Sequence, residues 1–330
     1  MPDVKPHIAW VLEASSLSGG VRVVYEFANG LSERGYPVSI LSLGPKPKWF
    51  SLHGKVRWLT YGSYPALGIA AKEIRPDVLI ATWWKTAYVV DDIRTQLGCR
   101  GLYLVQDVET EYYFDPITRQ AVMDTYALGL EHFTTSRWVE GNCPGECKYV
   151  GIAIGKMRGK GKQDAGRKRV VLAVLRRQSL KGFRELGEVA MRLQGAAVPL
   201  VTFGVDTGVQ LCGSHSHVHQ PTAIEVTHLY QSSSVFLSTS LHEGFSMTPV
   251  EAMSCGLPVV TFNAGGNMEY AVDGENCLIA DSPRHMAELA VRVVSDRSLA
   301  AALSKSGLST ASRYADWRVP VERLDALLGS

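Results

Sequence analysis

The chain has 330 residues, of which 46% are hydrophobic and 20% charged, and its formal net charge is +2. This length fits two domains of ordinary size, each with its own core. The near-neutral charge gives no reason to propose a nucleic-acid partner, and we expect none. No stretch approaches the roughly 20 apolar residues of a membrane span, and the N-terminus lacks a signal-peptide layout, so we expect a cytoplasmic protein.

Cysteines and histidines do not predict a metal site. The six cysteines are scattered, and only Cys143 and Cys147 lie close together, with no second pair to complete a zinc site. Reduced thiols are the expected state. His215, His217 and His219 alternate as on one side of a strand, but no acid or cysteine completes the ligand set.

The N-terminal region predicts the opening of a doubly wound α/β sheet. A buried strand at 7–12 precedes a loop of small residues, a helix from Val21 and a strand at 38–43. Gly19 and Gly20 let the backbone approach a ligand, and the helix start beyond them favours an anion. A simple tight turn is the alternative. The pattern is neither the dinucleotide fingerprint nor a P-loop.

Polar and aromatic residues follow the next predicted strands, at 56–60, 78–82 and 102–106. Trp83 either stacks on a sugar ring or packs in the core. Asp107 either orients an acceptor hydroxyl, acts as a base or caps the following helix. Residues 133–137 predict the last strand of the first domain and the entry into a helix. Seven basic residues at 156–169 indicate a solvated linker, or alternatively a contact with anionic lipid at the inner face of a membrane.

Residues 238–280 carry the strongest functional signal. A short strand leads into a loop with Glu243, then into a helix with Glu251 one turn in, and a strand follows at 259–262. Carboxylates accept hydrogen bonds from the paired hydroxyls of ribose or hexose. The amides at the helix start can hold ligand oxygens, and they belong to Gly244, Phe245, Ser246 and Met247. An ordinary αβ unit with two solvated glutamates is the alternative.

The run from Glu243 to Phe245 and from Glu251 to Val260 resembles the E-x7-E signature of retaining glycosyltransferases of family 4. Residues 273–279 resemble the segment that closes the donor pocket in that family. The resemblance implies the GT-B fold, with two Rossmann-like domains facing each other across a cleft. It implies an acceptor-side domain at 1–152, a nucleotide-sugar-binding domain at 153–313 and a terminal helix at 314–330 that packs back on the first domain.

The resemblance also implies roles for charged residues. Glu251 would hold the ribose hydroxyls, and Glu243 would bind sugar hydroxyls. Arg176 and Lys181 have the family's spacing of five and would stabilise the diphosphate together with the Gly19–Gly20 loop. Two cations would take the place of a metal, so no metal or cofactor is expected. Leu175 stands where the family has a glycine.

The first domain departs from the family pattern. Many members have a histidine where Gln106 or Asp107 stands, and this chain has none there. The run 104–109 resembles a bacterial subgroup that includes rhamnosyltransferases of surface polysaccharides. Trp83, Gln106 and Glu109 are the expected acceptor-side residues.

The expected reaction is transfer of a hexosyl or deoxyhexosyl group from a nucleoside-diphosphate sugar, with retention of configuration. The acceptor would be a hydroxyl of a glycan, a lipid-linked molecule or a small molecule, and weak contact with a membrane surface is part of this expectation. One alternative is a nucleotide-sugar epimerase or a phosphorylase on the same fold. The other is a donor- or glycan-binding protein without turnover.

Overall fold

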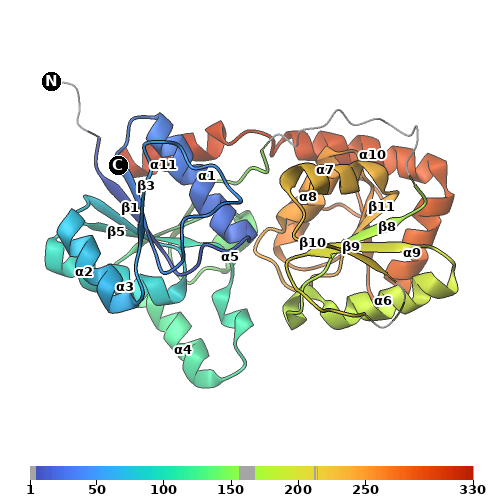
Figure 1. The fold of residues 1–330 in the computed structure, drawn as a ribbon, viewed down its shortest axis with the longest axis horizontal. Helices are drawn as coiled ribbons and strands as arrows, with labels where there is room; N and C mark the ends of the chain where they lie inside the picture. The colour runs from blue at the N-terminus through green and yellow to red at the C-terminus, as the bar shows by residue number, and fades with distance from the viewer. Residues whose placement is uncertain (1–4, 156–167, 212, 214, 330) are drawn as a thin grey trace. The chain divides into compact units, whose positions relative to one another are not determined.

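The computed structural model describes residues 5–155, 168–211, 213 and 215–329 (Figure 1). Contacts divide the chain into two compact units. Unit 1 comprises Met1–Ile152 and Trp317–Ser330, and unit 2 comprises Ala153–Asp316. The chain therefore leaves unit 1 once and returns to it for its last helix.

Unit 1 is built on a parallel seven-stranded sheet with the order β3-β2-β1-β4-β5-β6-β7. Because β1 pairs with both β2 and β4, the strand order reverses at β1, and ligands of open α/β sheets bind at such switch points. β1 and β2 are buried along their whole length, as expected for parallel strands covered on both faces. The strands are β1 (Ile8–Leu12), β2 (Val38–Ser42), β3 (Arg57–Thr60), β4 (Val78–Ala81), β5 (Arg100–Val105), β6 (Glu131–Thr134) and β7 (Cys147–Tyr149).

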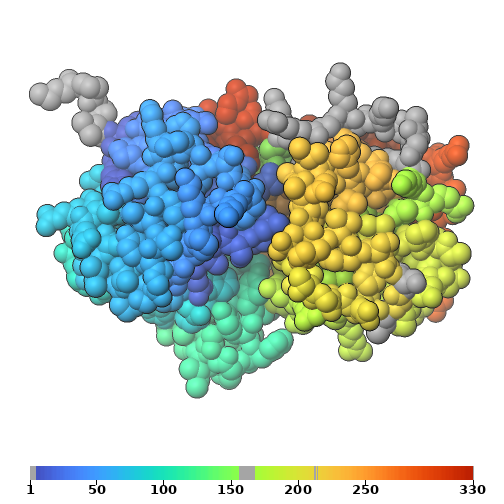
Figure 2. Space-filling view, in the orientation of Figure 1, coloured from blue at the N-terminus to red at the C-terminus, as the bar shows by residue number. Residues whose placement is uncertain are grey.

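Four helices of unit 1 begin at side-chain caps. Ser18, Ser63, Asp115 and Ser136 each accept a hydrogen bond from a backbone N–H of the first turn that follows. Helix α4 extends away from the body of unit 1 (Figures 1 and 2). The helices are α1 (Gly19–Glu33), α2 (Tyr64–Ile74), α3 (Trp84–Leu97), η1 (Glu109–Tyr112), α4 (Pro116–Asp124), η2 (Thr125–Ala127), α5 (Arg137–Asn142) and α11 (Arg318–Gly329).

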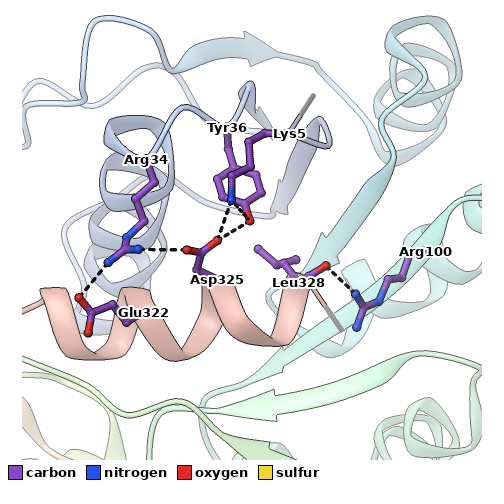
Figure 3. Close-up of polar contacts among 7 residues, drawn as sticks. All are labelled: Lys5, Arg34, Tyr36, Arg100, Glu322, Asp325 and Leu328. Atoms are coloured by element: carbon purple, nitrogen blue, oxygen red, sulfur yellow. Dashed lines mark hydrogen bonds and ion pairs between the residues drawn. The ribbon is translucent and has the colours of Figure 1, made fainter. Parts of the chain in front are cut away.

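Hydrogen bonds and ion pairs connect α11 to other segments of unit 1 (Figure 3). Asp325 accepts hydrogen bonds from Arg34 at 3.0 Å and from Lys5 at 3.3 Å, and Tyr36 also donates to it. Arg100 donates to two carbonyls at the end of the helix, at 3.0 and 3.1 Å. Because the last carbonyls of a helix have no partner within it, Arg100 satisfies groups that would otherwise cost free energy.

Unit 2 is built on a parallel six-stranded sheet with the order β10-β9-β8-β11-β12-β13. Here the order reverses at β8, which pairs with β9 and β11. The strands are β8 (Val171–Val174), β9 (Leu200–Gly204), β10 (Ser216–His219), β11 (Val235–Ser238), β12 (Val259–Phe262) and β13 (Leu278–Ala280). The helices are η3 (Ser179–Lys181), α6 (Phe183–Gly195), α7 (Ala223–Ser232), α8 (Met247–Ser254), η4 (Gly266–Glu269), α9 (Pro283–Ser295) and α10 (Arg297–Ser312).

Two predictions about local structure were wrong. Helix α1 begins at Gly19 rather than Val21, because Ser18 caps it and draws both glycines into the first turn. The strand predicted within 133–137 is β6, and it is not the last strand of unit 1, because β7 pairs beside it. The basic segment predicted at 156–169 lies outside the described residues, apart from its last two.

Candidate functional site

Charged residues gather where β8 and β11 end, beside the point at which the second sheet reverses its strand order. Arg176 follows β8 closely, and Lys181 is the last residue of η3. Glu243 lies in the loop after β11. Neighbouring parallel strands end at the same edge of a sheet, so the fold brings these segments together at the edge where α/β proteins bind ligands.

Lys181 and Glu243 form a direct ion pair. The Lys181 ammonium lies 3.0 Å from Oε2 of Glu243, and the two side chains are 20% and 19% exposed. Ser240 donates its hydroxyl to the other carboxylate oxygen at 2.7 Å. Lys181 also approaches the carbonyl of His242 at 3.4 Å. Both oxygens of Glu243 are therefore oriented, and its charge is balanced in a partly desolvated place.

A glycine fixes the position of Lys181. Gly182 has φ +69°, and a Cβ built there would lie 1.8 Å from the carbonyl oxygen of Thr239. Leu241 donates its N–H to the carbonyl of Leu180 at 2.8 Å. The turn after η3 thus packs backbone to backbone against the loop that carries Glu243, which is why only glycine fits at position 182.

The loop of Glu243 is held on its other side by the turn after β12. Glu243 donates its N–H to Ala264 at 2.8 Å and accepts at its carbonyl from Gly266 at 2.8 Å. A Cβ at Gly266 would lie 2.0 Å from the carbonyl oxygen of Gly244. The Gly265–Gly266 turn predicted from sequence therefore serves as a close backbone contact with this loop.

A buried amide stabilises that turn. Asn267 is fully buried; its Oδ1 accepts from the N–H of Ala264 at 2.9 Å. Its Nδ2 donates to the carbonyl of Phe262 at 2.7 Å and to the hydroxyl of Thr261 at 3.0 Å. Sequence reasoning missed Asn267 because no periodic pattern marks a polar residue that is satisfied entirely by a turn.

The start of α8 has a strained cap. Ser246 has φ +67° and ψ 86° and is 7% exposed, and its side chain makes no capping hydrogen bond. Tyr270 donates its hydroxyl to the Ser246 carbonyl at 2.8 Å. The Phe245 ring packs between Tyr270 and Tyr314, at centroid distances of 5.2 and 5.1 Å. Packing therefore imposes the left-handed conformation and aims the start of α8, which begins at Met247 as predicted.

Glu251 lies one turn into α8, as predicted, but it is buried rather than solvated. It is 8% exposed, and the hydroxyl of Tyr230 on α7 donates to its Oε2 at 3.3 Å. Tyr230 is itself fully buried, with its ring edge-on to Phe203 and Phe236. A buried carboxylate needs hydrogen-bond partners, so Tyr230 belongs to the site although no sequence signal singled it out.

Leu175 stands where the family resemblance predicts a glycine, and the structure shows how the leucine is accommodated there. Leu175 is fully buried and donates its N–H to Phe203 at 2.8 Å, so it extends the pairing of β8 with β9. The close approach occurs across the sheet instead, since a Cβ at Gly204 would lie 2.3 Å from the carbonyl oxygen of Leu175. Arg176 is half-buried directly after it.

In unit 1 the structure places Gly20 against Gln106. A Cβ at Gly20 would lie 3.1 Å from the side-chain oxygen of Gln106. Asp107 accepts from the N–H of Val108 at 2.8 Å and from the hydroxyl of Tyr112 at 2.6 Å. Both of these partners of Asp107 are close in sequence, and neither bond caps η1, whose N-cap is Val108 without a side-chain hydrogen bond. The role of Asp107 therefore stays a prediction.

Glu109 lies beneath this surface rather than on it. It is 1% exposed, and its Oε2 accepts from the N–H of Trp84 at 2.8 Å. Burial raises the pKa of Glu109 to about 8, although the neighbouring Tyr103 hydroxyl and the hydrogen bond from the Trp84 N–H oppose the shift. Glu109 is therefore mostly protonated at neutral pH. Trp83 is half-buried, with its ring edge-on to Tyr112 at 5.8 Å.

The described residues contain neither a cluster of metal ligands nor a helix suited to crossing a membrane. In the parts of the chain that the structure describes, no group of three or more His, Cys, Asp or Glu is arranged to hold a metal ion. His217 instead contacts the Thr202 hydroxyl at 3.0 Å through Nδ1. None of the described helices combines the length and apolar character needed to cross a bilayer.

The two parallel-sheet α/β units define the GT-B fold, as the sequence predicted. HepE of Anabaena, solved in complex with UDP-glucose, matches with a TM-score of 0.83 and 16% identity, over 98% of this chain and 99% of that one. The sucrose-phosphate synthase of Thermosynechococcus elongatus matches with a TM-score of 0.77 and 16% identity, over 98% of each chain. Identities this low establish the fold alone.

Sequence comparison shows which known proteins this chain resembles. Residues 159–309 match the family described as "Glycosyl transferases group 1". The chain is 33% identical over 88 residues to the lipopolysaccharide core biosynthesis mannosyltransferase LpsB of Rhizobium meliloti, which is 26% of this chain and 25% of LpsB. It is 27% identical over 270 residues to the O-antigen biosynthesis protein RfbC of Myxococcus xanthus, 75% of this chain and 20% of RfbC. The chain thus spans about a quarter or less of the length of these relatives.

Proposed function

We propose that the protein is a retaining, metal-independent glycosyltransferase of the family 4 type that uses a nucleoside-diphosphate sugar. The observation that carries this proposal is the Lys181–Glu243 ion pair with Glu251 nearby in sequence, within the residues that match the group 1 glycosyltransferases. A carboxylate and a cation held at the ligand-binding edge of a sheet suit a donor that carries both hydroxyls and phosphates.

Glu251 is proposed to accept hydrogen bonds from the ribose hydroxyls. Its Oε2 is held by Tyr230, so the remaining acceptor positions are oriented before the donor arrives. Glu243 is proposed to accept from the transferred sugar's hydroxyls, with Ser240 fixing one oxygen. Such preorganisation lowers the entropy lost on binding. The backbone amides from Gly244 to Met247 are proposed to assist.

Lys181 and Arg176 are proposed to neutralise the leaving diphosphate. Lys181 is paired with Glu243, and a phosphate oxygen of the donor is proposed as an additional partner of its ammonium. Negative charge on the leaving group grows as the glycosidic bond breaks, and a fixed cation stabilises the transition state more than the bound donor. Gly19 and Gly20, in the first turn of α1, are proposed as further donor-binding residues.

The acceptor is proposed to be a hydroxyl of a glycan or lipid-linked saccharide. This follows the two relatives, whose names place them in lipopolysaccharide core and O-antigen biosynthesis. Trp83, Gln106 and Asp107 are the proposed acceptor-side residues, and the transferred group is proposed to be hexosyl or deoxyhexosyl. Weak contact with a membrane surface completes this proposal.

The deciding experiment measures thermal unfolding of the full chain with UDP-, GDP- and dTDP-sugars. A ligand at 100 times its dissociation constant adds about 2.7 kcal/mol of stability, which shifts the melting temperature visibly. We expect one donor class to produce this shift. Glu251→Ala should weaken its binding tenfold or more, since a hydrogen bond to a charged group contributes about 1.5–3 kcal/mol. Glu188→Ala, an exposed acid on α6 paired with Arg192, is the matched control. No shift with any donor, or equal affinities for both variants, would overturn the donor site.

Assays of sugar transfer test the role of Lys181, the retention of configuration and the independence from metal. Lys181→Ala should lower kcat more than donor affinity, whereas equal losses would argue that the cation acts only in ground-state binding. Product NMR of the anomeric proton distinguishes retention from inversion. Full activity after exhaustive treatment with EDTA is expected, and restoration by an added divalent metal would contradict metal independence.

A further inference from the structure

Two cysteines flank the loop between α5 and β7 in unit 1. Cys143 is the C-cap of α5 and half-buried, whereas Cys147 begins β7 and is 7% exposed. Cys147 belongs to an apolar core cluster of unit 1, and Cys143 packs against the same cluster.

The connecting loop is shaped to hold the thiols together. Pro144, Gly145 and Glu146 separate the cysteines, and Gly145 has φ +88°, which turns the chain back toward β7. Glycine adopts this conformation without the steric cost that a Cβ brings. Gly145 and Glu146 are exposed, so a small molecule can reach the loop from solvent.

The two thiols differ in chemical character. The hydrogen bond from Cys147 lowers the pKa of Cys143, while burial opposes that shift. The same hydrogen bond and burial raise the pKa of Cys147. Cys143, the more exposed of the two, is therefore the better nucleophile, since the thiolate is the reactive form. Cys147 is the protonated partner behind it.

We propose that Cys143 and Cys147 form a reversible dithiol–disulfide site that exchanges with low-molecular-weight disulfides such as oxidised glutathione. This inference concerns unit 1 and does not depend on the proposed transferase activity.

The exchange occurs in two balanced steps. The Cys143 thiolate attacks one sulfur of oxidised glutathione, forming a mixed disulfide and releasing one glutathione thiolate, which takes up the proton Cys143 had lost. Cys147 then loses its proton and attacks the Cys143 sulfur, which forms the intramolecular disulfide and releases the second glutathione. The two cysteines are oxidised by two electrons and one glutathione disulfide is reduced to two thiols. The intramolecular disulfide would join the end of α5 to the start of β7.

The remaining described cysteines provide internal controls. Cys255 and Cys277 are buried in unit 2, and Cys99 is half-buried in unit 1 beyond α3. Burial raises the pKa of Cys99 and of Cys277, which disfavours the thiolate at both. These three cysteines should therefore stay reduced under mild exchange conditions.

The test uses the reduced full chain, incubated with oxidised glutathione and measured by intact mass. Wild-type protein should lose about 2 Da, as expected for one disulfide, and dithiothreitol should restore the mass. Cys147→Ser should instead gain about 305 Da, one glutathionyl group at Cys143, because the resolving thiol is missing. Cys143→Ser should stay unchanged. Cys99→Ser is the matched control and should behave as wild type.

Peptide mapping locates the bond. Trypsin cleaves after Arg137 and Lys148, so both cysteines fall within one peptide, which should become about 2 Da lighter in oxidised wild-type protein. A wild-type protein that accumulates the glutathione adduct without closing would overturn the proposal. So would equal glutathionylation of the Cys143→Ser and Cys147→Ser variants, or a disulfide mapped to other cysteines.

Discussion

Replacing Glu109 with glutamine is expected to remove a pH-dependent loss of stability from unit 1. In the folded protein the pKa of Glu109 rises from an ordinary 4.5 to about 8, chiefly because the carboxyl is buried, with Asp107 and Glu13 adding smaller repulsion. Between these two pH values the folded chain holds a proton that the unfolded chain releases. Stability is therefore full below pH 4.5 and falls as pH rises to about 8.

The expected magnitude follows from that interval. Each pH unit within it costs about 1.4 kcal/mol, so the total approaches 5 kcal/mol, an upper bound for a single buried group. Glutamine closely mimics the protonated carboxyl: its oxygen can accept from the Trp84 N–H, and its amide can donate to the neighbouring Tyr103 hydroxyl. Glu109→Gln and wild type should therefore match near pH 4.5, and the variant should be several kcal/mol more stable near pH 8.5.

Tryptophan fluorescence isolates the effect to the correct unit, because all seven tryptophans belong to unit 1. Urea unfolding followed by fluorescence, from about pH 4.5 to about pH 8.5, gives the free energy of unfolding at each pH. Glu73→Gln, at an exposed position on α2, is the control and should leave the wild-type pH profile in place. Parallel profiles for Glu109→Gln and wild type would refute the assignment of a protonated, buried Glu109.

Three further substitutions test contacts within each unit. Asn267→Ala should destabilise unit 2 by about 3 kcal/mol, because it strands the buried N–H of Ala264 and two acceptors, and far-UV circular dichroism during urea unfolding measures this. Ser246→Gly should raise stability by about 1 kcal/mol, since glycine adopts φ +67° without strain, and a decrease in the same assay would contradict the argument. Asp325→Asn should cost about 1 kcal/mol at pH 7 and little near pH 3. Burial opposes the ionisation of Asp325, but hydrogen bonds from Tyr36, Lys5 and Arg34 lower its pKa below the ordinary 3.8. Asp325 therefore stabilises the fold above that pH, and this stabilisation is lost as the pH falls. Urea unfolding followed by fluorescence at pH 7 and near pH 3 measures the difference.

Local patterns in the sequence sufficed for the elements that surround the candidate site. Strand β12 has the bounds predicted from its short apolar run, and Glu251 lies one turn into α8 as predicted. These features depend on neighbours in the chain: apolar runs make buried parallel strands, and Gly256 with Pro258 ends a helix. The GT-B fold was likewise predicted and confirmed, although the roles of the site residues remain predictions.

Tertiary structure decided which of those residues touch. Lys181 and Glu243 are 62 positions apart, and their contact exists because η3 and the loop after β11 meet at one edge of the sheet. Gly182 and Gly266 are needed because backbone atoms of distant segments approach them closely. Hydrophobic periodicity in the sequence does not predict such contacts. The start of α1 was misplaced for a local reason, since the Ser18 cap outweighs the poor helix propensity of two glycines.

Burial is the second property that only the three-dimensional packing decides. Glu109 and Glu251 are both acids, yet the first becomes a protonated group that accepts from the backbone N–H of Trp84, and the second accepts a hydrogen bond from a buried tyrosine. A carboxyl's charge state depends on the water and hydrogen-bond partners within a few ångströms, and these come from distant segments. The sequence by itself therefore determined the elements and the candidate residues, whereas packing decided their contacts, their solvation and, for Glu109, its protonation.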